Sequence, residues 1–284
     1  MSRPILLDLF CGAGGAAMGY HRAGFDVVGV DIKPQPRYPF KFIQYDLSNA
    51  DLEFDLDLAA FDAIHASPPC QAYSSATTSL HAHKHPRMIE PIRELMQGLT
   101  DGDGCPLMPC VIENVERAPL NGPILCGSMF GLMTDRYELR RHRRFEAIHW
   151  EWPTLMPPCA HGQRPIVAGV YGGGGEDRTK AKRAGSRGGF TPDVATRRAL
   201  MGMPWATQHE IGEAIPPAYT EWIGARLLAA LRADDVVMIS TMSGFLDWVE
   251  AGPKEGRFRR TPPLDSSEDF PADEATAWAR EARP

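Results

Sequence analysis

The sequence predicts an α/β protein built on a mostly parallel sheet flanked by helices. Short apolar runs at residues 5–10, 26–31, 61–66 and 110–115 have the composition of buried strands. Helical patterns separate or follow them at residues 16–24, 87–99 and 218–232. Such alternation is typical of parallel βαβ units, in which ligands bind beyond the carboxyl ends of the strands.

The amino-acid composition changes along the chain and predicts how the chain is divided into domains. We expect a catalytic and cofactor-binding domain over residues 1–145, which resumes at 196–235 with a C-terminal helix. Residues 146–195 are rich in glycine, proline and basic side chains, so we expect a small irregular insert there. Residues 236–284 are predicted to form a tail that is poorly ordered in part.

Composition limits the possible partners and compartments. The longest apolar runs fall short of the roughly 18 residues of a membrane helix, and we expect neither a signal peptide nor a membrane partner. The six cysteines are scattered, which favours reduced thiols and a cytoplasmic protein. Cys159 and His161 lie two apart, but nothing nearby in the sequence completes a ligand set, so we expect no metal.

Positive charge is concentrated in one part of an acidic protein. Residues 136–198 hold 13 lysines and arginines against 6 acids, a net of +7, so the remainder of the −6 chain carries −13. This asymmetry predicts one face suited to a polyanion.

A glycine-rich turn follows the first predicted strand. One acid stands at the end of the second strand, and another follows the place, before residue 46, where a third strand should end. Glycines at such a turn let the backbone approach a ligand closely. Asp31, at the end of the second strand, is placed to accept hydrogen bonds from a ribose, and Asp46 could contact an adenine amine. The sequence therefore predicts a site for an adenosine-bearing cofactor. The residues of the turn are Asp8, Phe10, Cys11, Gly12, Ala13, Gly14 and Gly15.

A thiol and a carboxyl follow two further strands. Two prolines fix the backbone directly before Cys70, which favours presentation of a nucleophilic thiol at the sheet edge. Glu113-Asn114-Val115 ends the run at 110–115, so the Glu113 carboxyl is expected to reach the same pocket from the adjacent strand.

These motifs, in their order, carry a resemblance to a known family. DLFCGAGG (8–15), SPPCQ (67–71) and ENV (113–115) resemble the cofactor, nucleophile and acid motifs of the DNA (cytosine-5)-methyltransferase family. LRRHR (139–143) and GEAIPP (212–217) resemble two further motifs of that family. The chain looks like a short stand-alone bacterial or phage type.

The resemblance implies a fold, a reaction and a set of residues. The implied fold is the Rossmann-like fold of S-adenosylmethionine-dependent methyltransferases, and the implied reaction is methylation of carbon 5 of a flipped cytosine. It implies Cys70 as nucleophile, Glu113 as the acid at the ring nitrogen, and Arg141 and Arg143 as the arginines that hold the base and support the thiolate. The resemblance also places Ile32, Leu47, Pro69, Glu213 and Ala214 at the S-adenosylmethionine site.

Double-stranded DNA is the partner that the resemblance implies. The polar segment 72–86 resembles the loop that closes over DNA, and its His81, His83 and His85 are interpreted as phosphate contacts or exposed side chains. The insert takes the place of the target-recognition region, and its small size predicts a short target sequence. We expect a monomer.

Two departures keep alternatives open. Leu139 stands where the family has Gln, and Glu213 stands where it has Asn near the reactive end of the cofactor. They leave open transfer of a modified group from an S-adenosyl donor analogue and a non-catalytic DNA-binding relative. A third alternative is tRNA methylation, because the tRNA-methylating branch of the family shares these motifs.

Overall fold

The computed structural model describes residues 3–48, 57–74, 83–153, 156, 158–161, 166–170 and 191–240, with side chains up to 232. Three predicted features lie outside these residues: most of the loop at 72–86, the basic stretch at 177–189 and the tail beyond 240.

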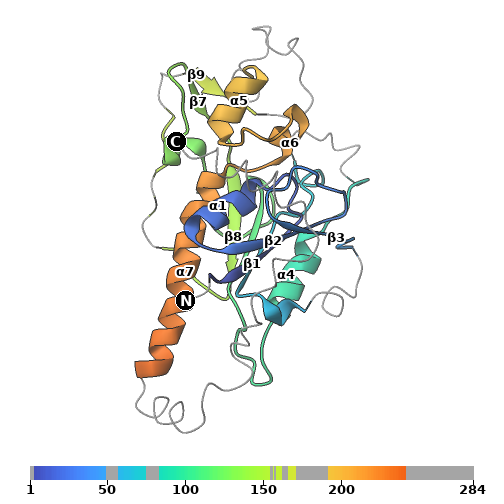
Figure 1. Cartoon of the computed structure of the whole chain (residues 1–284), viewed down its shortest axis with the longest axis vertical. Coiled ribbons are helices and arrows are strands. Elements are labelled where there is room, and N and C mark those ends of the chain that lie inside the picture. The colour runs from blue at the N-terminus through green and yellow to red at the C-terminus, as the bar shows by residue number, and fades with distance from the viewer. Residues whose placement is uncertain are drawn as a thin grey trace.

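A seven-stranded sheet forms the centre of the molecule (Figure 1). Its order is β3-β2-β1-β4-β5-β8-β6, and neighbouring strands from β3 to β5 are parallel. Only β8 reverses direction, pairing antiparallel with β5 and β6. The predicted mostly parallel sheet is therefore confirmed. The strands are β1 (Ile5–Leu9), β2 (Asp26–Asp31), β3 (Lys41–Gln44), β4 (Ala63–Ala66), β5 (Cys110–Val115), β6 (Ile124–Leu125) and β8 (Arg143–Ile148).

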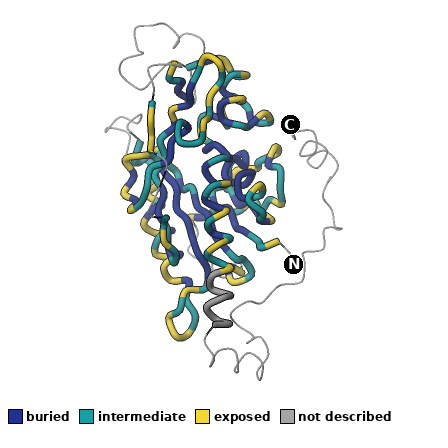
Figure 2. The backbone as a smooth tube through the Cα atoms, turned by 90° about the vertical axis from the view of Figure 1, so that its left-hand side faces the viewer, coloured by how far each residue is buried: buried dark blue, intermediate teal, exposed yellow. Residues whose placement is uncertain are grey.

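Helices cover both faces of the sheet. On one face α1 (Gly15–Ala23) and α7 (Pro217–Ser240) lie side by side, and on the other lies α4 (Ile89–Gly98), with the short helix η1 (Leu58–Ala60) nearby. Side chains of β1 alternate between the two layers, because successive residues of a strand point to opposite faces. Leu6 packs in the layer of α1 and α7, and Leu7 and Leu9 pack in the layer of α4. Figure 2 shows the buried strands running between these layers.

Helices α1 and α7 approach too closely for a side chain at their contact. A Cβ atom at Gly19 would lie 2.1 Å from the carbonyl oxygen of Pro217 and 2.1 Å from the hydroxyl oxygen of Thr220. The Thr220 hydroxyl donates to the Ala16 carbonyl at 2.8 Å. Glycine at position 19 thus permits the docking of α7, which brings the segment before α7 to the glycine turn.

A smaller layer sits beyond one end of the sheet, at the top of Figure 1. It contains the two-stranded sheet of β7 (Tyr137–Leu139) and β9 (Ile166–Ala168), with α5 (Val194–Met201) and α6 (Gln208–Glu213). Leu139, Ala168 and Leu200 share its core. The predicted domain limit at 145/146 falls inside β8, and the described part of the predicted insert includes β9.

The three predicted helices are present with shifted ends, whereas α5 and α6 were not predicted. Helix α4 begins two residues after the predicted start, and α7 runs to residue 240 instead of 232. Among the described helices, none combines the length and the apolar character needed to cross a membrane.

Candidate functional site

The ends of four parallel strands meet at one edge of the sheet. Leu9 of β1 is in register with Val30 of β2 and with Ala66 of β4, and Ala66 is in register with Ile112 of β5. The residues that come next on these strands are therefore Phe10, Asp31, Ser67 and Glu113. The glycine turn, the segment before Cys70 and the predicted acid all start from this edge.

The glycine turn is shaped by left-handed backbone and by a close neighbour. Phe10, Gly12 and Gly14 have φ angles of 59°, 50° and 82°. A Cβ at Gly15 would lie 2.4 Å from the Ile215 carbonyl oxygen, whereas one at Gly12 would meet nothing within 4 Å. Glycine is thus required for packing at position 15, and at position 12 it leaves open space beside the turn.

Asp31 closes this turn from the neighbouring strand. One of its carboxylate oxygens accepts the Gly12 amide at 3.0 Å, and the other accepts the Lys33 amide at 3.0 Å. The adjoining Ile32 side chain is 54% exposed, a large apolar surface left uncovered beside a carboxylate. An acid beside an uncovered apolar side chain matches the needs of a ribose and an adenine ring.

Asp8 is a buried carboxyl beneath the turn. It is fully buried, and neither oxygen has a hydrogen-bond partner of normal geometry among the described residues. Burial, reinforced by Asp31, raises the pKa of Asp8 well above its usual range, and the Ala17 amide offsets only part of this effect. An orphaned buried oxygen at the sheet edge fits a polar ligand that supplies the missing donor.

The other residues predicted to bind the cofactor do not all lie at the glycine turn. Ala13 and Ala214 lie at the turn: the Ala13 carbonyl accepts the Trp205 indole N–H at 2.8 Å, and Ala214 lies 3.2 Å from the Cβ position of Gly15. Cys11 is buried near the turn, whereas Leu47 packs in the hydrophobic core against the α4 layer.

The acids Asp46 and Glu213 contact side chains that are close to them in the sequence. One Asp46 oxygen accepts both the amide and the hydroxyl of Ser48, at 3.0 and 2.7 Å, which lowers the pKa of Asp46. The Glu213 side chain is 63% exposed and faces His209 at 3.5 Å. The half-buried Pro69 belongs to the segment that carries Cys70.

Asn114 attaches the Cys70 segment to β5. Its side-chain amide donates to the Pro68 carbonyl at 2.8 Å, and the Cys70 carbonyl accepts the Tyr73 amide at 3.0 Å. The half-buried thiol of Cys70 is thus held next to the end of β5. Sequence reasoning did not single out Asn114, although its place in the ENV motif was the available signal.

Glu113 and Arg143 form a buried ion pair beside Cys70. The Glu113 Oε1 and Arg143 Nε atoms are 3.1 Å apart, and both side chains are largely shielded from water. Burial raises the pKa of Glu113, while Arg143 opposes the rise. Burial also raises the pKa of the Cys70 thiol, against the lowering effect of Arg143 and Arg141. The arginines act in the predicted direction, but burial outweighs them.

Arg141 is oriented by backbone carbonyls from two other segments. Its guanidinium donates to the Val170 carbonyl at 2.5 Å and to the Gly212 carbonyl at 2.8 Å. The Tyr219 hydroxyl donates to the Arg141 carbonyl at 2.7 Å. Burial lowers the pKa of Arg141 to about 9, so it remains a cation at neutral pH. One buried cation therefore links the LRRHR and GEAIPP segments.

Three residues that flank Arg141 and Arg143 in the sequence have different surroundings. Arg140 is exposed, whereas Arg144 donates to the carbonyls of Glu116 and Gly122 at 2.9 and 3.2 Å. Leu139, which stands in the place of the family's Gln, is completely buried in the smaller core.

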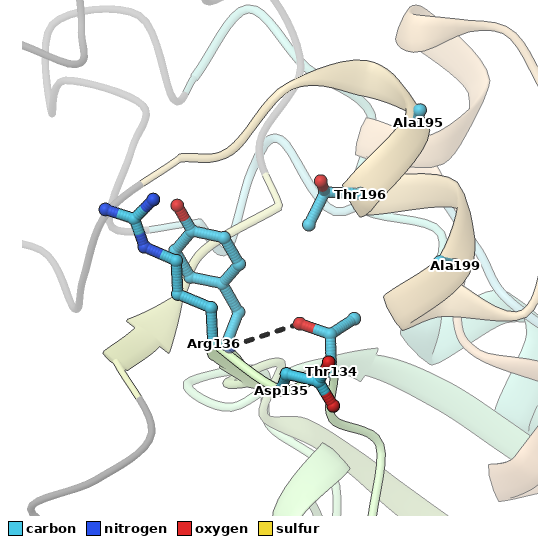
Figure 3. Close-up of a pocket in the computed structure, with 7 residues that line it drawn as sticks. Thr134, Asp135, Arg136, Ala195, Thr196 and Ala199 are labelled. Carbon is cyan, nitrogen blue, oxygen red and sulfur yellow. Dashed lines mark hydrogen bonds between the residues drawn. The ribbon is translucent and has the colours of Figure 1, made fainter.

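A pocket of about 400 Å³ opens elsewhere, between the start of β7 and α5 (Figure 3). Thr134, Arg136 and Thr196 are among its lining residues, and the Thr134 hydroxyl accepts the Tyr137 amide at 3.1 Å. None of the predicted catalytic or cofactor residues lines it, so it is separate from the sheet edge described above.

The fold is that of Rossmann-like methyltransferases. The chain is similar to a methyltransferase of Entamoeba histolytica, with a TM-score of 0.52 and 12% identity over 81% of this chain and 99% of that one. It is also similar to the Dnmt2 methyltransferase of S. pombe, with a TM-score of 0.49 and 13% identity over the same shares.

One segment of the chain matches a known family model. Residues 5–92 match the family described as C-5 cytosine-specific DNA methylase. A stretch of 35 residues is 60% identical to the type II methyltransferase M.XorII of Xanthomonas oryzae and spans 12% of this chain and 8% of that relative. The resemblance to the DNA (cytosine-5)-methyltransferase family is thereby confirmed, with the glycine turn and Cys70 inside the matched segment.

Proposed function

We propose that this protein is a DNA cytosine carbon-5 methyltransferase that uses Cys70 as a covalent nucleophile. The observation that carries the proposal is the sheet edge itself, where the Cys70 segment lies beside the Glu113–Arg143 ion pair. The match of residues 5–92 to C-5 cytosine-specific DNA methylases supports it. Double-stranded DNA is the proposed substrate.

Cys70 supplies the electron pair in the proposed first step. Its thiolate forms a bond to carbon 6 of cytosine, and the ring electrons move toward carbon 5 and the ring nitrogen beside the amine. Once carbon 5 carries the new methyl group, loss of its proton to a base and departure of the sulfur restore the aromatic ring and the thiolate. Because burial raises the pKa of the free thiol, the two arginines are the groups that favour the reactive thiolate.

Glu113 is proposed to hold a proton at the ring nitrogen. Its raised pKa keeps the carboxyl protonated to a higher pH than that of an exposed glutamate. A protonated carboxyl donates a hydrogen bond to the nitrogen and stabilises the charge that develops in the ring. Arg143, paired with Glu113, holds this carboxyl in place.

The glycine turn is proposed to hold S-adenosylmethionine, which when bound supplies an electrophilic methyl group. Asp31 would accept the ribose hydroxyls and Ile32 would cover the adenine ring. The open space at Gly12 and the orphaned oxygens of Asp8 fit such a ligand. Gly14, Gly15 and Ala214 form the backbone wall of this proposed site.

The test is incubation of the full chain with labelled S-adenosylmethionine and either unmethylated duplex DNA or tRNA. We expect labelled 5-methylcytosine in the DNA, and mass spectrometry of the product nucleosides identifies the transferred group. DNA that carries 5-fluorocytosine should trap a covalent complex, since fluorine replaces the proton that must leave. Labelling of tRNA alone, or equal labelling by the Cys70→Ser variant, contradicts the proposal.

A further inference from the structure

Four metal-ligating side chains converge at a place that the proposed reaction does not use. Cys126, His142, Cys159 and His161 each offer one ligand atom, and these four atoms all lie within 4.8 Å of one another. We call them the Cys2His2 cluster. They come from three segments: the junction between β6 and the short helix η2 (Gly127–Phe130), the residue before β8, and the segment between β8 and β9. We propose that the Cys2His2 cluster binds a structural zinc ion.

The spacing of the ligand atoms suits tetrahedral coordination. The Cys126 sulfur lies 3.3 Å from Nε2 of His161, and the Cys159 sulfur lies 3.4 Å from Nε2 of His142. In a tetrahedral zinc site, bonds of about 2.3 Å to sulfur and about 2.0 Å to nitrogen separate the two atoms by about 3.5 Å. The observed distances therefore leave room for one ion at the centre.

Both histidines are oriented as metal ligands usually are. Nδ1 of His161 lies 2.9 Å from a Glu138 oxygen, and Nδ1 of His142 lies 3.2 Å from a Glu116 oxygen. A carboxylate that accepts the Nδ1 proton leaves the lone pair of Nε2 free for a metal. Each imidazole thus turns Nε2 toward a sulfur and Nδ1 toward a carboxylate, which is an arrangement of outer partners that holds zinc ligands in place.

The nature of the ligands selects zinc among the common divalent ions. Two thiolates and two neutral imidazoles form a set of soft and borderline donors, whereas Mg²⁺ and Ca²⁺ require oxygen. Two thiolates also neutralise the charge of Zn²⁺. All four coordination positions are filled by protein atoms, so the site is structural and leaves no position open for a substrate.

The position of the cluster gives the ion a role in the fold. His142 lies between Arg141 and Arg143, whose side chains belong to the sheet edge with Cys70. Cys159 and His161 belong to the first part of the predicted insert, between β8 and β9. A zinc ion would therefore attach the start of this insert to the arginine segment, and His142 would be a positioning residue for both arginines.

This proposal reverses the expectation of a metal-free protein. That expectation rested on the absence of a second nearby ligand pair along the sequence, and the partners of Cys159 and His161 are 17 or more positions away. The proposal does not depend on the proposed methylation, because its readout is metal content.

The test is elemental analysis of the full chain, produced with zinc in the medium and without a metal-binding tag. We expect one zinc per chain, and loss of that zinc from Cys159→Ser and from His161→Ala, whose side chains lie near the surface. Cys105→Ser is the matched control, because this free, half-buried cysteine lies outside the cluster. Circular dichroism confirms that each variant is folded.

Cobalt substitution tests the geometry. The native chain reloaded with Co²⁺ should show the intense visible bands of a tetrahedral ion and a sulfur-to-cobalt charge-transfer band, and Cys159→Ser should lack both. Glu138→Gln keeps all four ligands and should weaken zinc affinity about 10- to 100-fold. Substoichiometric zinc with the same cobalt spectrum in native protein and Cys159→Ser overturns the proposal. A Cys126–Cys159 disulfide, revealed by fewer than six free thiols in the metal-free denatured chain, overturns it equally.

Discussion

Cysteines at two places in this molecule have contrasting surroundings. Cys70 lies at the carboxyl edge of the sheet, where its charged neighbours are Arg143, Glu113 and Arg141. Cys126 and Cys159 face imidazole nitrogens at 3.3 and 3.4 Å. A thiol among charged groups is suited to nucleophilic attack, whereas thiols that share their space with imidazoles are suited to a metal.

The contrast teaches that the partners of a cysteine, and not the residue type, decide its chemistry. It also separates two kinds of variant. Changes at the sheet edge should remove activity and leave the fold intact. Changes at the Cys2His2 cluster, or in the smaller layer that contains β7, should act through stability. The following predictions test this separation, in order of decreasing effect.

Replacement of the proposed nucleophile should have the largest effect. Cys70→Ser should lower kcat for DNA methylation by about 1,000-fold or more, because a serine hydroxyl is a far weaker nucleophile than a thiolate. The measurement is incorporation of label into duplex DNA at saturating S-adenosylmethionine. Thermal unfolding should be nearly unchanged, since the side chain is only half-buried. Strong destabilisation with residual activity would assign Cys70 to packing.

Removal of the acid should come next. Glu113→Gln keeps the shape of the side chain but cannot deliver a proton, so kcat should fall about 100-fold. The measurement compares kcat and KM on the same DNA. Exposed Glu94 on α4 supplies a matched control, because Glu94→Gln lies away from the sheet edge and should leave kcat unchanged. Equal rates for the native chain and Glu113→Gln would remove Glu113 from the chemistry.

Restoring the family's Gln at position 139 should cost stability. Leu139 is completely buried among apolar side chains, so Leu139→Gln buries an amide and should lower the free energy of unfolding by about 1–3 kcal/mol. Chemical denaturation measures this loss. Arg140→Gln alters the exposed neighbour and should change stability by less than about 0.5 kcal/mol. A stabilised Leu139→Gln would show that the position is built for a polar side chain.

The smallest predicted effect is a shift in pH dependence. Arg143 lowers the pKa of both Cys70 and Glu113, and burial raises both. In Arg143→Gln both pKa values should therefore rise, so that the thiol loses its proton at higher pH and the carboxyl keeps its proton to higher pH. The pH optimum of kcat/KM should move upward. A downward shift, or the same profile in both proteins, would contradict the proposed electrostatic role of Arg143.

The sheet edge could be predicted from the sequence because its residues follow strands. Register in a parallel sheet brings the ends of neighbouring strands together, so Asp31, Ser67 and Glu113 were predictable as neighbours once the strands were recognised. The ordered motifs then connected these residues to a family. The sequence did not show the reversed direction of β8, which depends on its pairing with β5 and β6.

The sequence by itself determined the mostly parallel sheet, its glycine turn and the candidate residues at the strand ends, because periodicity and turn chemistry are local properties. Only the tertiary structure decided the burial that raises the pKa of Cys70, the orphaned carboxyl of Asp8 and the convergence of the Cys2His2 cluster. Each of these depends on atoms that are distant in the chain and become neighbours only when the layers pack. Electrostatics and coordination act through distance in space, which no spacing along the sequence records.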